Sequence, residues 1–256
     1  MPRRVLAGVA LVLLLAACGF GPARPTLAPG PATSVPVATA PTAPPTTTRP
    51  LNITATAAVP SVAVWDAPGG QGDPSRTLAN PAPPYNVPLV FLVRQQQPDW
   101  LEVLLPIRPN GSSGWIRRSD VTLASNDYRI VVELGAHQIT VYEGEAVFDQ
   151  EPIGVGTQDT PTPGGLYYTK ELLQPVDDNG NLIPEGPYGP YAYGLSGYSD
   201  VLYDFAGGDG VIGIHGTNDP SSIGHDASHG CIRMANDGIT KLAKTLPIGV
   251  PVEIKA

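Results

Sequence analysis

Short runs of apolar residues, separated by turn residues, dominate the chain after about residue 60 and indicate β-strands. In the first half of this region, such runs occupy residues 62–65, 88–93, 100–105 and 114–116. The dipeptide Asn110-Gly111 separates the last two of them, and this pair favours a tight hairpin turn. Several short strands at this spacing predict a small β-barrel.

The second half of the region continues the strand pattern and adds one helix. Its apolar runs are residues 128–134, 138–142, 146–148, 151–156 and 250–254. Helical spacing appears only late, at Ile239, Leu242, Ala243 and Leu246. Asn236 or Asp237 is expected to cap this helix, and Pro247 to end it. The fold class predicted for the whole chain is therefore mostly β, with one late helix.

The first predicted module resembles a known small barrel. The series from Asp99 to Val121, which includes Gly114-Trp115-Ile116, is similar to bacterial SH3-like domains. We assign residues 59–124 to this module. Trp100 and Trp115 are candidates for a ligand groove, but large aromatic residues more often pack in a core. We expect a core position for both.

The N-terminus has the composition of an export signal. Arg3 and Arg4 precede an apolar run from Val5 to Ala17, which is short for a membrane span. The run ends in Leu15-Ala16-Ala17-Cys18, which resembles the lipobox of bacterial lipoproteins. This resemblance implies a signal peptide at 1–17 and a lipid anchor on Cys18. The protein is then expected outside the cytoplasm, in the cell envelope, bound to the membrane. A plain signal peptide with an unmodified cysteine is the alternative.

Residues 18–58 form a low-complexity segment rich in Pro, Ala and Thr. Such a segment buries too little apolar surface to offset the entropy of ordering, so we expect a disordered, extended linker. Two folded modules fit the length of 256 residues. The formal net charge is −8 and no basic block occurs, which makes nucleic acid an improbable partner. Nothing in the pattern requires an oligomer, and a monomer is expected.

Two cysteines in an exported protein would ordinarily pair. If Cys18 carries lipid, however, Cys231 is a lone thiol in an oxidising compartment and needs a function to explain it. The densest group of reactive residues surrounds it, with one Cys, three His and several Gly between Ile214 and Met234. An imidazole can remove a thiol proton or stabilise the thiolate, and glycine lets backbone N–H groups approach an oxyanion.

A metal-binding site is the alternative chemical interpretation of this cluster. His215, His225, His229 and Cys231 include ligand types that zinc accepts. The cluster contains no C-x-x-C pair, and His229 and Cys231 are separated by a single residue; we expect no metal. Histidines that merely satisfy their hydrogen bonds in a core are a further alternative.

The cluster resembles a known catalytic signature. His215-Gly216-Thr217 followed by Ser228-His229-Gly230-Cys231-Ile232-Arg233-Met234 is similar to the YkuD-type L,D-transpeptidase catalytic domain. The upstream stretch from Pro152 to Gly164 resembles that family's substrate-side loop, and Gly189-Pro190-Tyr191 also matches. The resemblance covers residues 127–256 and implies a β-rich catalytic domain.

The resemblance also implies residue roles. Cys231 is the nucleophile and His215 its base, oriented by the carbonyl of Gly216. His229 lines the site, and the N–H groups of Gly230 and Cys231 form an oxyanion hole. The expected substrate-side residues are Arg233, Ser228, Thr217 and Tyr191. Arg233 is either a carboxylate-binding group or part of a structural salt bridge, and Ser228 also fixes the loop by hydrogen bonds.

The implied reaction acts on peptidoglycan stem peptides. Cys231 attacks the carbonyl between the third residue and the terminal D-Ala, and an amine of a second stem then attacks the thioester to form a 3→3 cross-link. No cofactor is needed, and carbapenems are expected to acylate Cys231. Water, a free D-amino acid or a protein lysine could replace the acceptor. A non-catalytic wall-binding lipoprotein is the rival from another class.

Overall fold

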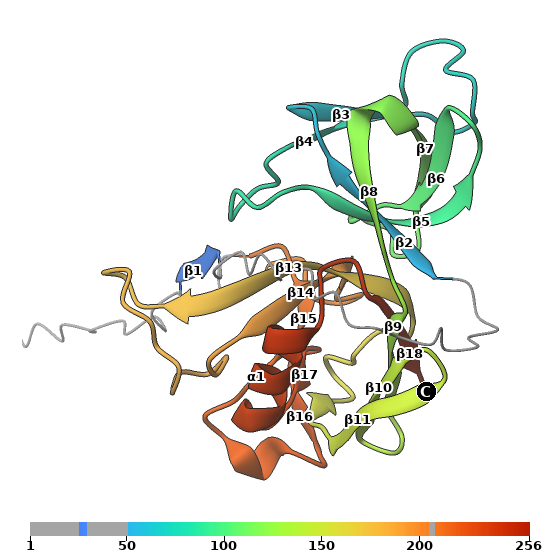
Figure 1. Ribbon diagram of the computed structural model, residues 1–256. Helices are drawn as coiled ribbons and strands as arrows, with labels where there is room; N and C mark the ends of the chain where they lie inside the picture. The colour runs from blue at the N-terminus through green and yellow to red at the C-terminus, as the bar shows by residue number, and fades with distance from the viewer. Residues whose placement is uncertain (1–25, 30–50, 205–207) are drawn as a thin grey trace, which may run out of the picture.

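The computed structural model describes residues 26–29, 51–204 and 208–256, which form two β-sheet modules (Figure 1). The predicted signal peptide, Cys18 and most of the predicted linker lie outside the described residues. Strands dominate, and α1 (Asn236–Thr245) is the one α-helix of the described chain. The prediction of a mostly β fold with one late helix is therefore confirmed. No helix in the described ranges has the length and apolar character that crossing a bilayer requires.

The first module is built on a five-stranded sheet with the order β7-β6-β5-β2-β8. Its strands are β2 (Asn52–Ala57), β5 (Val90–Gln96), β6 (Trp100–Leu104), β7 (Ser113–Arg117) and β8 (Val121–Asn126). A separate hairpin joins β3 (Ser61–Val64) to β4 (Arg76–Ala79), and a 3-10 turn, η1 (Arg118–Asp120), precedes β8. Alternating residues of these strands enclose a core that includes Phe91, Leu101, Val103 and Ile116.

The tryptophans of this module differ in burial. Trp100 is buried, as expected, and packs edge-on against Trp65 with ring centroids 5.1 Å apart. The Arg117 guanidinium lies over both rings, 5.1–5.2 Å from their centroids. Trp115, which was also expected in the core, is only half-buried.

The prediction of a disordered linker reaching residue 58 is wrong for its last residues. Asn52–Ala57 form β2, which pairs with both β5 and β8 and so lies inside the sheet. Earlier in the linker, β1 (Thr26–Pro29) pairs with the second module's β13. Both segments are rich in Thr and Ala, and backbone pairing with distant strands, which composition does not register, orders them.

The second module contains a nine-stranded sheet with the order β11-β10-β9-β18-β13-β14-β15-β17, to which β1 adds beside β13. Its strands are β9 (Tyr128–Glu133), β10 (Gln138–Glu143), β11 (Ala146–Pro152), β13 (Gly165–Val176), β14 (Ala192–Tyr198), β15 (Val211–His215), β17 (Ile232–Arg233) and β18 (Pro251–Lys255). The short strands β12 (Val155–Gly156) and β16 (Asp226–Ser228) pair with each other in parallel, and η2 (Pro220–Ser222) precedes β16.

Helix α1 packs its apolar face on the sheet through Ile239 and Leu242, both fully buried in the main core. The predicted cap is wrong, because Ala235 is the N-cap residue and no side chain caps the helix. Asn236 instead accepts a hydrogen bond from the backbone N–H of Thr217 at 2.8 Å. The helix ends at Thr245, two residues before Pro247. Its first turn therefore supports the loop that follows β15.

The two modules share a packed junction. Tyr168 of β13 is fully buried against Leu92 and Leu104, and its hydroxyl donates to the carbonyl of Val90 at 2.8 Å. Arg108 donates from the first module to three carbonyls of the β14–β15 connection. The acceptors, with distances, are Ser199 (2.6 Å), Leu202 (2.9 Å) and Asp209 (2.9 Å). These contacts fix the first module on the sheet face that carries Tyr168 and Tyr198.

Candidate active site

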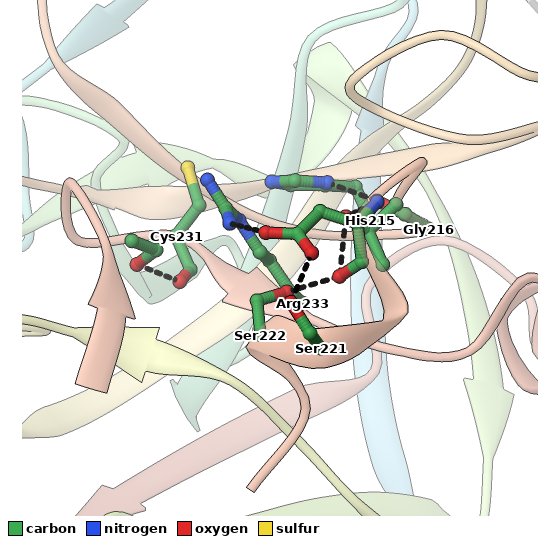
Figure 2. Close-up of polar contacts among 9 residues, drawn as sticks. His215, Gly216, Ser221, Ser222, Cys231 and Arg233 are labelled. Carbon is green, nitrogen blue, oxygen red and sulfur yellow. Dashed lines mark hydrogen bonds and ion pairs between the residues drawn. The ribbon is translucent and has the colours of Figure 1, made fainter. Parts of the chain in front are cut away.

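Strands β15 and β17 bring the predicted histidine and cysteine onto one face of the sheet. They pair in parallel, with Ile214 opposite Ile232 and His215 opposite Arg233. Ile214 and Ile232 both belong to the main core. Because successive side chains alternate between the faces of a sheet, His215, Arg233 and Cys231 share the other face. Figure 2 shows the three side chains gathered on one side of the ribbon.

His215 is held in one orientation. Its side chain is buried, and its Nδ1 lies 2.5 Å from the carbonyl oxygen of Gly216. Because a carbonyl oxygen only accepts, Nδ1 carries the proton and Nε2 keeps its lone pair in the neutral ring. The Cδ2 edge of the ring lies 3.9 Å from the position of a Cβ added at Gly213. Extending the β15–β17 register by one residue places Gly213 beside Cys231. Because Cδ2 and Nε2 are adjacent ring atoms and Cδ2 lies near Gly213, the Nε2 side of the ring faces the thiol.

Both reactive groups are uncharged at neutral pH. The pKa of His215 is lowered to about 4, mainly by burial and also by Arg233, against the raising effect of the Gly216 hydrogen bond. Burial raises the pKa of the Cys231 thiol above its ordinary value, against the lowering effects of a backbone hydrogen bond from Gly213 and of Arg233. The resting pair is therefore a thiol beside a neutral imidazole. This arrangement suits proton transfer during attack and does not require a preformed ion pair.

The loop before Cys231 is organised by Ser228. The buried Ser228 hydroxyl accepts from the Gly230 N–H at 3.1 Å and donates to the Cys231 carbonyl at 2.6 Å. Gly230 has a φ of +112°, which favours glycine. Its N–H, expected to help form an oxyanion hole, is thus used inside the loop. The Cys231 N–H donates no hydrogen bond within the described chain.

The loop between β11 and β13 lies against this segment, as the resemblance implied. The N–H of Thr157 and the hydroxyl of Thr160 both donate to the Ser228 carbonyl, at 3.1 and 3.2 Å. A Cβ added at Gly230 would lie 3.4 Å from the carbonyl oxygen of Pro161. Residues 157–161 therefore pack against the segment that precedes Cys231, and their place on the substrate side stays a prediction.

Two of the other expected substrate-side residues have structural contacts. The Thr217 hydroxyl accepts from the Asp219 N–H at 3.0 Å and so shapes the turn after β15. Tyr191 is half-buried against the main core, and its carbonyl accepts from Gly216 at 3.2 Å. Both residues support the backbone around His215 and Gly216.

Arg233 and His229 are more open. Arg233 lies on the reactive face, with its Nη1 3.9 Å from Asp219 Oδ2 and 54% of the Asp219 side chain exposed. An ion pair this long and exposed contributes little, so the Arg233 guanidinium remains available to another anion. His229 is exposed on the loop before Gly230, and His225 is exposed as well.

Two residues around the base were missed by sequence reasoning. The Tyr188 ring packs against the His215 imidazole, with centroids 4.9 Å apart. Burial raises the pKa of Tyr188 to about 12, with smaller contributions from Cys231 and from Tyr85 of the first module. Asn236 holds the Thr217 backbone. Tyr188 could have been found because it directly precedes Gly189-Pro190-Tyr191, which matched the family. Asn236 was interpreted only as a possible helix cap, so its contact with Thr217 was not expected.

Cys231 is a free, half-buried thiol. Among residues 26–29, 51–204 and 208–256, no group of three or more His, Cys, Asp and Glu side chains is placed to hold a metal ion. The chemistry that the described residues offer is a thiol, a base and a nearby cation.

Comparison with known proteins identifies a family in which this domain is found. The family model described as the YkuD L,D-transpeptidase catalytic domain matches residues 127–254. The putative L,D-transpeptidase YkuD of Bacillus licheniformis is 38% identical over 127 residues, which cover 50% of this chain and 65% of that protein. The putative L,D-transpeptidase YqjB of Bacillus subtilis is 32% identical over 130 residues, covering 50% of this chain and 71% of that protein.

A solved structure is also similar. L,D-transpeptidase 3 from Mycobacterium tuberculosis, in complex with a faropenem-derived adduct, aligns with a TM-score of 0.40 and 16% identity. The alignment covers 59% of this chain and 76% of that one.

Proposed function

The chain belongs to the YkuD family of L,D-transpeptidase catalytic domains, and we propose that it cross-links peptidoglycan stem peptides through a thioester on Cys231. The observation that carries this proposal is the shared face of β15 and β17. On it a neutral imidazole, fixed through Nδ1, presents its unprotonated edge toward the thiol. This is the arrangement that acyl transfer by a cysteine needs.

The first half-reaction forms the acyl-enzyme. His215 Nε2 takes the Cys231 proton as the sulfur attacks the carbonyl of the third stem residue, and the C–N bond to D-Ala breaks. The same proton passes to the leaving amine. The Cys231 N–H, which is free of other hydrogen bonds in the described chain, is the backbone donor for the developing oxyanion. The Gly216 carbonyl stabilises the transient imidazolium through Nδ1–H, as the third member of a triad does.

The second half-reaction transfers the acyl group. A side-chain amine of a second stem attacks the thioester carbon, the C–S bond breaks, and the thiol regains its proton through His215. The product is a 3→3 cross-link. Arg233, whose one ion pair in the described chain is the 3.9 Å contact to Asp219, would bind a stem carboxylate beside the thiol. His229, exposed before Gly230, is the remaining candidate for proton or substrate contact.

The rest of the chain supports an envelope location in this proposal. The N-terminal sequence resembles a lipoprotein signal with Cys18 as the lipidated residue, and the SH3-like assignment of residues 59–124 is consistent with a five-stranded antiparallel sheet. The protein would then act as a monomer on the outer side of the membrane, with the first module docked beside the catalytic face.

The proposal is tested with the purified protein and a disaccharide tetrapeptide. Mass spectrometry should detect release of D-Ala, a thioester adduct mapped to Cys231, and a cross-linked dimer. Cys231→Ala should abolish all three, whereas a variant of the exposed His225, His225→Gln, should retain them. D-Ala release with no dimer would identify water as the acceptor. Absence of both release and adduct from the unmodified protein would overturn the proposed function.

A further inference from the structure

A buried carboxylate lies on the same sheet face as the reactive thiol. Glu171 of β13 has a side chain that is 2% exposed. Its Oε1 accepts from Lys170 Nζ at 2.8 Å, but its Oε2 is buried with no hydrogen-bond partner in the described chain. A buried carboxylate oxygen without a donor is unfavourable, and such groups often mark a place where a ligand supplies the missing contact.

A β-bulge aims this carboxylate. Thr169 lies opposite Leu195 and Glu171 opposite Gly194, so Lys170 is an extra residue on β13. The bulge lets the adjacent lysine and glutamate meet, although neighbours in a regular strand point to opposite faces. The carboxylate extends over Gly194, because a Cβ added there would overlap Glu171 Oε1. Glu171 therefore reaches across β14 toward β15.

The strand register places four residues in one row across the sheet. Glu171 lies opposite Gly194, Gly194 lies opposite Gly213, and Gly213 lies beside Cys231. The two middle positions have no side chain. Above Gly213, an added Cβ would meet only backbone atoms of Tyr193, the nearest 3.0 Å away, and the His215 ring at 3.9 Å. The Glu171 carboxylate thus covers Gly194, and the position over Gly213 lies between this carboxylate and the thiol.

We propose that the side chain of the third stem residue lies over Gly213, and that Glu171 Oε2 accepts a hydrogen bond from its terminal ammonium group. This inference rests on the proposed function, because it requires that residue's carbonyl to lie at the Cys231 sulfur. Two strand spacings separate Cys231 from Gly194, roughly 9–10 Å at about 4.8 Å each. An extended four-carbon side chain with a terminal nitrogen spans roughly 6 Å from its Cα, because each of its bonds advances about 1.25 Å along the chain axis. Adding the thioester linkage and a hydrogen bond closes the remaining distance.

The charges around Glu171 favour a cationic group on the ligand. Lys170 occupies Oε1 only, and Oε2 can accept but not donate when Glu171 is ionised. An ammonium donor provides a charge-assisted hydrogen bond, which is stronger than a neutral one. Arg233 at the thiol end disfavours a second cation there. Glu171 is accordingly a specificity-determining residue for the donor stem, separate from the groups that transfer protons.

The test compares two stems in the acylation half-reaction alone. One tetrapeptide has lysine at the third position, and the other has norleucine, which matches its carbon chain without the amine. D-Ala release in the first turnover is measured for the unmodified protein and for Glu171→Gln. The unmodified protein should acylate faster with the lysine stem by about tenfold to a hundredfold, the range expected for one charged hydrogen bond. In Glu171→Gln this preference should fall to within about threefold.

Two controls separate specificity from folding and from the proposed function. Acylation by faropenem, which has no ammonium group, should proceed at an unchanged rate in Glu171→Gln. Gly194→Ala, whose new methyl displaces the carboxylate, should reduce the preference for lysine in the same way. An equal preference for lysine in the unmodified protein and both variants would refute the subsite while leaving the proposed function intact. Failure of the unmodified protein to release D-Ala from either stem would instead refute the proposed function, and the subsite with it.

Discussion

The buried His215 should make the stability of the second module sensitive to acid. Its pKa is lowered from 6.5 to about 4 by burial, so the unfolded chain binds a proton between these values and the folded chain does not. Stability therefore rises with pH across this window and is lost as the pH falls from about 6.5 to about 4. At 1.36 kcal/mol for each pKa unit, the loss attributable to this side chain is roughly 3 kcal/mol.

The measurement is urea unfolding at pH 7.5 and pH 4, compared between the unmodified protein and His215→Gln. All three tryptophans lie at positions 65–115, so their fluorescence reports the first module. Far-UV circular dichroism follows the second module through α1. The drop in unfolding free energy between the two pH values should be about 3 kcal/mol smaller in His215→Gln.

Carboxylates also become protonated over this range. They do so in both proteins, so their contribution to the change in unfolding free energy cancels in the comparison. His225→Gln, at an exposed position, is the matched control and should behave as the unmodified protein does. Equal acid sensitivity of the unmodified protein and His215→Gln would refute the assignment of a buried, neutral imidazole.

Two further predictions concern the loop before the thiol and the junction between the modules. Ser228→Ala removes both hydrogen bonds that hold the loop, so the expected acylation of Cys231 by a carbapenem should slow about tenfold to a hundredfold through misplacement of the thiol. A rate equal to that of the unmodified protein would contradict the role of Ser228. Arg108→Ala removes three hydrogen bonds to the β14–β15 connection, and amide exchange at residues 199–204, followed by mass spectrometry, should accelerate about tenfold or more. Unchanged exchange there would mean that Arg108 does not hold this connection.

Local patterns predicted about half of the strands and the helix, and they missed the long strand β13 and its neighbour β14. The runs at 62–65, 88–93, 100–105 and 128–134 all contain strands, because alternation of apolar and polar residues is a property of neighbouring positions. The reactive residues were also visible in the sequence, since a thiol and its histidines are identified by residue type and spacing. The strand at Asn52–Ala57 was missed because its order comes from pairing with β5 and β8, far along the chain.

What the sequence alone determined is the inventory: alternating strands, one amphipathic helix, and a lone thiol near histidines with a family signature. What only the tertiary structure decided is which of these groups meet, and with what charge. His215 is neutral because folding buries it, and the Gly230 N–H is used within its own loop because Ser228 accepts it. Glu171, Gly194 and Gly213 lie in one row because the registers of β13, β14 and β15 align. Burial and strand register depend on contacts between segments far apart in the chain, so local composition does not determine them.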